Sequence, residues 1–289
     1  MAESPAHKFG QIIGELLEQI VRPQLEDFCK KHNLYLDYQK KNRPARNGRK
    51  VTWTDQYGNA HDLDFVIERD GSDLVKGRPV GFIEVAWRRY TKHSRNKTQE
   101  IQGAILPLAE KYRWNNPFLG VILAGIFTEG SLEQLKSTGF NILYFPYNTL
   151  ISAFLLEGVN IRFDEDTPDN IFQETAEIIK NIPPEISERI INHIISSNQN
   201  NIDYFLNSLN NRLKRQITRI VIIPLYGHQN EFLTISDALQ FLNAHSIYEG
   251  SGDFRKYEIS IEFSNNDKVQ AFLEDKEKII EFLEFVSNQ

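Results

Sequence analysis

The segment that most constrains the fold is the apolar run FLGVILAGIF at residues 118–127. It shows no alternation of apolar and polar residues, which is typical of a strand covered on both faces in the middle of an α/β sheet. The run is about half as long as a membrane-spanning helix requires. We therefore expect an α/β protein with helices on both faces of a sheet, and no contact with a membrane.

Helical and strand-like patterns alternate along residues 1–150. Apolar residues recur at helical spacing over 8–31, where Pro23 is expected to kink or divide the helix, and a second helix is expected from Ser94 to about Arg113. Strands are expected at 34–38, 51–54, 60–68, 79–87, 118–127 and 140–146, with a short helix near 130–137. The predicted order is therefore helix, strand meander, helix, central strand, helix, strand.

Residues 151–289 are expected to form a second region, helical at first and then of the α+β type. Helices are expected at 169–181, 183–197, 201–216, 234–244 and 266–287, and strands at 217–226 and 256–263. The two regions differ in charge, because residues 1–150 carry a net charge of +4 and residues 151–289 a net charge of −10. Either only the first region meets a polyanion, or the asymmetry arose by drift.

A single cysteine, Cys29, excludes an internal disulfide framework and a cysteine-rich zinc site. The first ten residues, MAESPAHKFG, are polar and show no apolar segment of the kind found in signal peptides. We therefore expect a cytoplasmic protein in a reducing compartment.

Two aspartates lie on the strand expected at 60–68, AHDLDFVIE. Because side chains alternate along a strand, Asp62 and Asp64 should point to one face, and Leu63 and Phe65 to the other. Two acids on one face of an apolar strand are costly unless a divalent cation or water offsets their charge. The pattern fits either a metal site with Asp62 and Asp64 as ligands, or an exposed edge strand with solvated acids.

A third acid, Glu84, lies inside the apolar run GFIEVAWRRY of the next expected strand. If the two strands pair, Glu84 approaches Asp64, and the two carboxylates with backbone oxygens and waters suit Mg²⁺. Such an ion lowers the pKa of a bound water and stabilises charge that builds on a phosphate. The alternative is a buried Glu84 paired with one of the nearby arginines.

These residues resemble the motif of the PD-(D/E)XK nuclease superfamily, which has the restriction-endonuclease-like fold. In that motif an Asp lies on one strand and (Asp/Glu)-x-Lys on the next, within a core of the order αβββαβ. Asp64 matches the first Asp and Glu84 the second acid, whereas Ala86 stands where the family has its Lys. The resemblance covers about residues 8–147, and it implies a mixed sheet flanked by helices and metal-dependent cleavage of DNA.

The resemblance also implies a lysine that orients or activates the attacking water, and some members carry a motif residue on the following helix. Lys97 is the candidate for this displaced lysine, and Glu100, three residues later on the same helix face, for an extra acid. The alternative is a surface ion pair between the two. Members also place an acid in the N-terminal helix, where Glu18 is the candidate, while a solvent-facing position is favoured for Glu15.

Two segments rich in cations, 39–50 and 87–97, flank these acids and contain no acidic residue. Cations of this kind neutralise the phosphate backbone and release counterions. The residues expected to contact DNA are Lys40, Lys41, Arg43, Arg46, Arg49, Lys50, Arg88, Arg89, Lys92 and Arg95. The alternative for 39–50 is a solvated, mobile loop.

Together these features predict an Mg²⁺-dependent endonuclease acting on double-stranded DNA, with a type II restriction enzyme as the first hypothesis. Cleavage of both strands at a palindromic site needs two active sites, so a homodimer is expected, with residues 151–289 supplying dimer contacts or DNA recognition. The alternatives are a repair or recombination nuclease of the same fold, and a catalytically inactive module that binds DNA or protein, which Ala86 favours.

Overall fold

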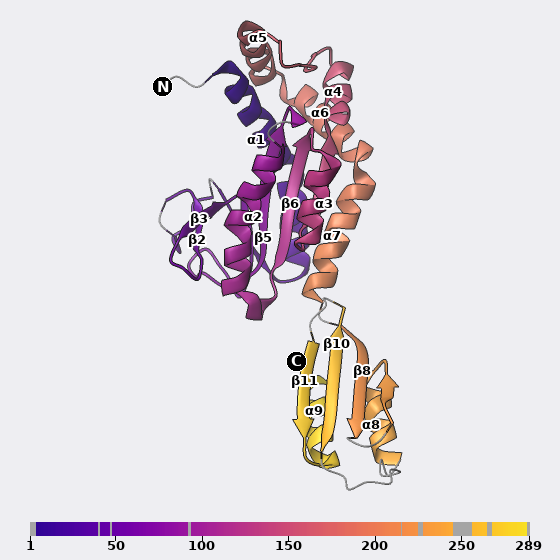
Figure 1. Ribbon diagram of the computed structural model, residues 1–289. Coiled ribbons are helices and arrows are strands. Elements are labelled where there is room, and N and C mark those ends of the chain that lie inside the picture. Colours follow the sequence, from indigo (N-terminus) through magenta and orange to yellow (C-terminus); the bar gives the residue numbers. More distant parts are fainter. Residues whose placement is uncertain are drawn as a thin grey trace. The chain divides into compact units, whose positions relative to one another are not determined.

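The computed structural model describes residues 4–39, 41–46, 48–91, 94–214, 216–224, 228–244, 256–264 and 268–287. The chain divides into two compact units, Met1–Leu209 and Asn210–Gln289, which are described separately (Figure 1). Among the described residues, no helix combines the length and the apolar character that a membrane crossing requires.

Unit 1 is built from seven α-helices, a short 3₁₀ turn and seven strands within the part of the chain described above. They are α1 (Pro5–Lys31), β1 (Tyr35–Tyr38), β2 (Val51–Thr54), β3 (Ala60–Leu63), β4 (Phe65–Arg69), β5 (Arg78–Arg88), α2 (Ser94–Lys111), η2 (Arg113–Asn115), β6 (Phe118–Gly125), α3 (Glu129–Ser137), β7 (Asn141–Pro146), α4 (Tyr147–Leu156), α5 (Asp169–Lys180), α6 (Pro184–Ser197) and α7 (Gln199–Leu213), whose last residues belong to unit 2.

A five-stranded mixed sheet forms the centre of unit 1, with the strand order β1-β4-β5-β6-β7. Strands β1, β4 and β5 pair antiparallel, and β6 and β7 continue the sheet parallel to β5. Helices α2 and α3 cover one face and α1 the other (Figure 1). The expected α/β class, with a mixed sheet flanked by helices, is therefore confirmed.

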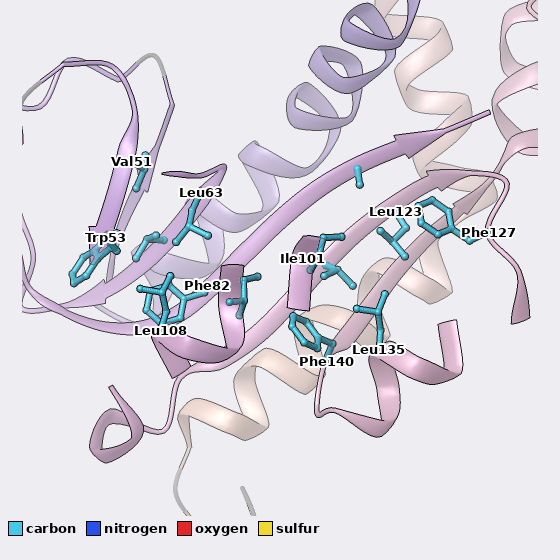
Figure 2. Close-up of a cluster of buried hydrophobic side chains, with 14 residues drawn as sticks. Val51, Trp53, Leu63, Phe82, Ile101, Leu108, Leu123, Phe127, Leu135 and Phe140 are labelled. Carbon is cyan, nitrogen blue, oxygen red and sulfur yellow. The ribbon is translucent and has the colours of Figure 1, made fainter. Parts of the chain in front are cut away.

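The apolar run that predicted a central strand forms β6, whose residues from Val121 to Ala124 are fully buried. Its odd-numbered residues join a core cluster with the inner faces of α2 and α3, and Figure 2 shows Leu123 in this cluster with Ile101 of α2 and Leu135 of α3. Because both faces of the strand pack against helices, no polar alternation is required of its sequence.

Helix α1 is continuous through Pro23, so the expectation that this proline divides the helix is wrong. Ser4 caps its first turn by accepting a hydrogen bond from the backbone of His7. A proline inside a helix removes one backbone hydrogen bond. Buried side chains on both sides of Pro23, including Ile20 and Leu25, hold the helix against the sheet, and tertiary packing of this kind supplies most of a helix's stability.

The single strand expected at 60–68 is broken at Asp64, which lies in a bend between β3 and β4. Strand β4 belongs to the central sheet, whereas β3 pairs with β2 in a separate two-stranded hairpin. The hairpin packs over the α2 side, because Trp53 contacts Tyr112 edge-on with ring centroids 5.4 Å apart. Asp64 therefore marks the point where the chain leaves the hairpin and enters the sheet.

Residues 151–209 belong to unit 1, so the boundary expected at residue 150 falls inside this unit. Helix α4 packs on β6 and β7, and α5 packs on α1. Helix α7 reaches the sheet through Phe205, whose ring lies 5.3 Å from that of Phe118. These contacts bury the apolar stripes of helices that a sequence boundary at 150 would have assigned to another region.

Unit 2 has an antiparallel four-stranded sheet of order β11-β10-β8-β9. Its elements are β8 (Ile217–Pro224), β9 (Asn230–Phe232), α8 (Ile235–Ala244), β10 (Tyr257–Phe263), β11 (Lys268–Leu273) and α9 (Lys276–Ser287). One core joins both helices to the sheet through residues such as Leu242, Ile259 and Leu283. The helix expected at 266–287 is thus a strand followed by a shorter helix.

A buried ion network fixes the loop that follows β1. The guanidinium of Arg43 is fully buried and binds Asp37 of β1 at 2.8 Å and Glu68 of β4 at 2.5 Å. Its other N–H groups donate to the backbone oxygens of Ser72 and Val75, so all its donors are used. The expectation that Arg43 contacts DNA is therefore wrong.

Arg46 belongs to the same network. Its Nε donates to Asp37 at 3.0 Å, its Nη2 donates to the backbone oxygens of Tyr38 and Lys41, and its side chain is 4% exposed. Its Nη1 also donates to the backbone oxygen of Gly48, so this buried guanidinium is held against the loop and is not presented to a phosphate at the surface. The expectation that Arg46 contacts DNA is also wrong.

We expect Arg43→Met to lower the free energy of unfolding by about 3–5 kcal/mol, because it leaves Glu68 buried without its ion-pair partner and Asp37 with Arg46 alone. Urea unfolding, followed by circular dichroism, measures the change. Arg49→Met removes a charge from an exposed position of the same loop and should change stability by less than about 0.5 kcal/mol. Equal effects of the two substitutions would contradict a structural role for Arg43.

Candidate active site

Asp64 and Glu84 lie opposite each other on neighbouring strands. The antiparallel register pairs Phe65 with Ile83, so the next pair in that direction joins Asp64 and Glu84. The backbone N–H of Val85 donates to Asp64 Oδ2 at 2.7 Å, which fixes the carboxylate beside β5. Both acids share the α2 face of the sheet with Val66 and Phe82, as the sequence predicts for residues two apart on a strand.

Burial raises the pKa of both carboxyl groups. For Glu84, desolvation and the neighbouring charge of Asp64 raise the pKa to about 8. For Asp64, desolvation raises the pKa, while the hydrogen bond from Val85 and the charge of Lys97 oppose the rise. Two acids that resist ionisation side by side are a site where a cation would be bound favourably.

Lys97, on the first turns of α2, brings positive charge to this pair. Its charge favours the ionised forms of both Asp64 and Glu84. It lies one helical turn before Ile101, on the side of α2 that faces the sheet, and its side chain is 21% exposed. Its Nζ lies 3.3 Å from Glu100, so the predicted ion pair of these two residues is present beside the acids.

Ala86 is buried and lines the same cavity as Lys97. Position 86, where the motif has its lysine, thus carries no charge. The cation that acts on Glu84 is Lys97 of α2. Glu100 is more exposed, at 59%, and also lies 3.8 Å from Arg88. Lys97 is therefore held between the carboxylate pair and Glu100.

A cavity of about 730 Å³ opens beside these residues. Strand β4 pairs with β5 no further than Ile83, so among the described residues no strand covers that edge of β5 from Val85 to Arg88. The cavity occupies this space between the N-terminal half of α1, the end of β5 and the first turns of α2. It adjoins the carboxylate pair through Val85 and Lys97.

Gly125 of β6 fixes the end of β5 next to this cavity. Its φ is +98°, and a Cβ there would lie 2.0 Å from the backbone oxygen of Arg88. That same oxygen accepts a hydrogen bond from Ile126 at 2.7 Å. Any side chain at 125 would push the two strands apart, so a glycine holds Arg88 in place.

Asp62 does not join the acid pair. It lies on the outer face of the hairpin, where it accepts hydrogen bonds from Lys50 and Thr52 at 2.6 Å. These bonds lower its pKa. Because the strand breaks at Asp64, the expected alternation along one continuous strand does not hold for Asp62 and Asp64, although the charge of Asp62 contributes to the raised pKa of Glu84.

Glu18 is half-buried on α1. Within the described part of the chain, no group of three or more His, Cys, Asp or Glu side chains is arranged to hold a metal ion. Glu18 therefore does not complete a cluster with Asp64 and Glu84.

The residues expected to contact DNA fall in different environments. Arg49 and Arg95 are exposed, Lys50 is paired with Asp62, and Lys41 lies 4.1 Å from the ring centroid of Tyr35. Arg88 and Arg89 line the cavity. Lys40 and Lys92 lie outside the described residues. Of these expected DNA contacts, Arg88 and Arg89 are therefore the ones that the structure places in the wall of the cavity beside the acids.

Sequence reasoning missed Gln39, whose Nε2 donates to Asp64 Oδ1 at 3.1 Å. This bond and the one from Val85 orient both oxygens of the carboxylate. Gln39 follows β1 and comes to Asp64 only because β1 pairs with β4, a pairing for which the sequence carries no local signal.

We expect the stability of the protein in EDTA to fall as the pH rises from about 4.5 to 8, through the contribution of Glu84. Its folded-state pKa lies above its unfolded value, so the folded state holds the proton more tightly and loses this advantage on deprotonation. Glu84→Gln should therefore gain stability relative to the wild type across this range. Thermal melts of both proteins at several pH values measure the difference, and a constant difference would contradict the shifted pKa.

Comparisons with known proteins give no family. No family model matches the chain, and no curated protein matches it. Among solved structures, the chain is similar to a crystal structure of a protein of unknown function, AF1548, at 12% identity and a TM-score of 0.29, over 65% of this chain and 99% of that one.

Proposed function

We propose that unit 1 is a restriction-endonuclease-like core and that the protein is an Mg²⁺-dependent DNA endonuclease. The observation that carries the proposal is the pair formed by Asp64 and Glu84 on adjacent strands, with Lys97 beside it. The mixed sheet behind this pair, with α1 on one face and α2 on the other, agrees with the helix and strand order that the motif resemblance implies.

The donor set of the pair fits Mg²⁺. Asp64 and Glu84 supply carboxylate oxygens, which are the ligands that this ion prefers, and Mg²⁺ commonly binds one or two carboxylates and keeps several waters. Their raised pKa values indicate that the pair gains from a nearby cation. When bound, the ion would lower the pKa of a water and offset the charge that develops on the phosphate.

The chain's own residues orient the reactants. The bonds from Gln39 and Val85 fix both oxygens of Asp64, so its carboxylate needs no rearrangement before it binds. Lys97 is placed to donate a hydrogen bond from Nζ to the attacking water or to a phosphate oxygen. Glu100, 3.3 Å from that nitrogen, holds it in position.

The contact with DNA is proposed for the cations nearest the acids. Arg88 and Arg89 lie within the cavity wall, and Arg95 is exposed on the first turn of α2. Cations so close to a carboxylate pair neutralise backbone phosphates at the point of cleavage. The proposed substrate is double-stranded DNA, and the proposed location is cytoplasmic. A homodimer is part of the proposal, because cleavage of both strands needs two active sites.

We expect Asp64→Asn, Glu84→Gln and Lys97→Met each to lower the rate of plasmid cleavage in Mg²⁺ by at least about 10²-fold, because each removes charge or orientation at the reacting phosphate. Gel electrophoresis of a supercoiled plasmid over time measures the rate. Lys136→Met is the matched control for Lys97→Met, because it removes an exposed lysine of α3 that pairs with Glu133.

A second comparison tests the metal assignment. Asp62→Asn makes the same chemical change as Asp64→Asn two residues away, and we expect it to retain cleavage within a few-fold. Full activity of Asp64→Asn would refute the role of the pair. Inactive wild-type protein that binds DNA tightly would instead support the catalytically inactive binding module.

A further inference from the structure

The cavity beside the acids has properties that phosphodiester cleavage alone does not require. A duplex could be cut on a flat surface, whereas here a solvent-open cavity of about 730 Å³ lies between α1, the end of β5 and α2. Pockets of about 300–1,000 Å³ are of the size that holds small molecules. A base inside a duplex is stacked and paired, whereas an unpaired nucleotide can turn out of the helix into a pocket without breaking a base pair.

The wall of the cavity combines rings with cations. Trp87 and Tyr90 line it together with Arg88, Arg89 and Lys97. Aromatic side chains and guanidinium planes stack on bases, and guanidinium groups bind phosphate oxygens in pairs. This combination matches a nucleotide, which has an aromatic base at one end and a phosphate at the other.

The surroundings of Arg89 indicate which group of a ligand the cavity wall could bind. Its guanidinium lies 4.2 Å from the ring centroid of Tyr90 and 4.1 Å from that of Phe172. No ion pair joins it to a carboxylate among the residues that the structure describes, and burial lowers its pKa. Asp164 and Asp169 act on its charge without forming an ion pair with it. A fixed, partly desolvated guanidinium of this kind is suited to bind an external anion.

Glu100, the acid in the wall of the cavity, pairs with cations other than Arg89. Glu100 lies 3.3 Å from Lys97 and 3.8 Å from Arg88, and is 59% exposed. Arg88, Arg89 and Lys97 outnumber Glu100 in the wall, whereas the carboxyl groups of Asp64 and Glu84 lie at its mouth. The cations of the wall are the groups that can bind the phosphate of an anionic ligand.

We propose that this cavity binds a single unpaired nucleotide next to the cleaved bond, with its phosphate on Arg89. The substrate would then be DNA that carries an unpaired nucleotide, such as a bulge or a junction of single and double strand. The inference rests on the proposed function in that the carboxylate pair lies at the mouth of the cavity, but its test needs no cleavage.

The experiment compares two labelled duplexes that differ only by one extra nucleotide in one strand. Fluorescence anisotropy in EDTA measures the affinity of the full chain for each, so neither Mg²⁺ nor catalysis contributes. We expect the bulged duplex to bind at least about tenfold more tightly, and Arg89→Gln to remove this preference. Arg69→Gln, which removes an equal charge from an exposed position at the end of β4, should keep it.

A second variant fills the cavity without removing a charge. Gly14 of α1 lines the cavity, and a Cβ placed there would meet no atom within 4 Å. Gly14→Leu puts a good helix former in a helix interior, so the variant is expected to melt at or above the wild-type temperature. Its side chain would occupy the space of the nucleotide, and we expect the preference for the bulged duplex to be lost.

The outcomes separate this inference from the proposed function. Equal affinity of the wild type for both duplexes, or an unchanged preference in Gly14→Leu, overturns the nucleotide pocket. Cleavage of fully paired DNA in Mg²⁺ together with equal affinities would keep the nuclease and remove the pocket. A preference for the bulged duplex without cleavage in Mg²⁺ would keep the pocket and remove the nuclease.

Discussion

Two carboxyl groups facing each other across a strand pair, largely withdrawn from water, are the feature on which the rest of unit 1 depends. Asp64 and Glu84 are opposed because β4 begins where the hairpin chain turns into the sheet. Desolvation and mutual repulsion disfavour ionisation of both. Such an arrangement weakens a fold unless a cation relieves it, so its presence at the edge of a cavity argues for function.

Much of the framework could be predicted from local patterns. The apolar run of β6, the helical spacing of α1 and the opposition of Asp64 and Glu84 all follow from side-chain periodicity, and the structure agrees with each. The break at Asp64 could not be predicted, because AHDLDFVIE contains no glycine or proline that would mark an interruption of the strand. Trp53 and Leu63 pack with residues of α2 in one core cluster, and β3 pairs with β2 outside the central sheet.

The environment of the basic residues could not be predicted from the sequence. A run of six basic residues between 39 and 50 looks like a surface for a polyanion, yet two of its arginines are buried against Asp37 and Glu68. The partner acids lie outside the run and reach it only through the pairing of β1 with β4. In the same way, residues 151–209 join unit 1 through contacts with α1 and the sheet, which no local pattern at 150 reveals.

The buried network of Arg43 also limits how the sequence can vary. A chain that lost the Arg43 guanidinium would keep Glu68 enclosed without an ion-pair partner and Asp37 with Arg46 alone, and a chain that lost either acid would leave positive charge in excess. Positions 37, 43 and 68 should therefore change in concert during evolution, although the last lies 31 positions after the first. Their covariation would mark descent with this loop architecture, independently of whether Asp64 and Glu84 are retained.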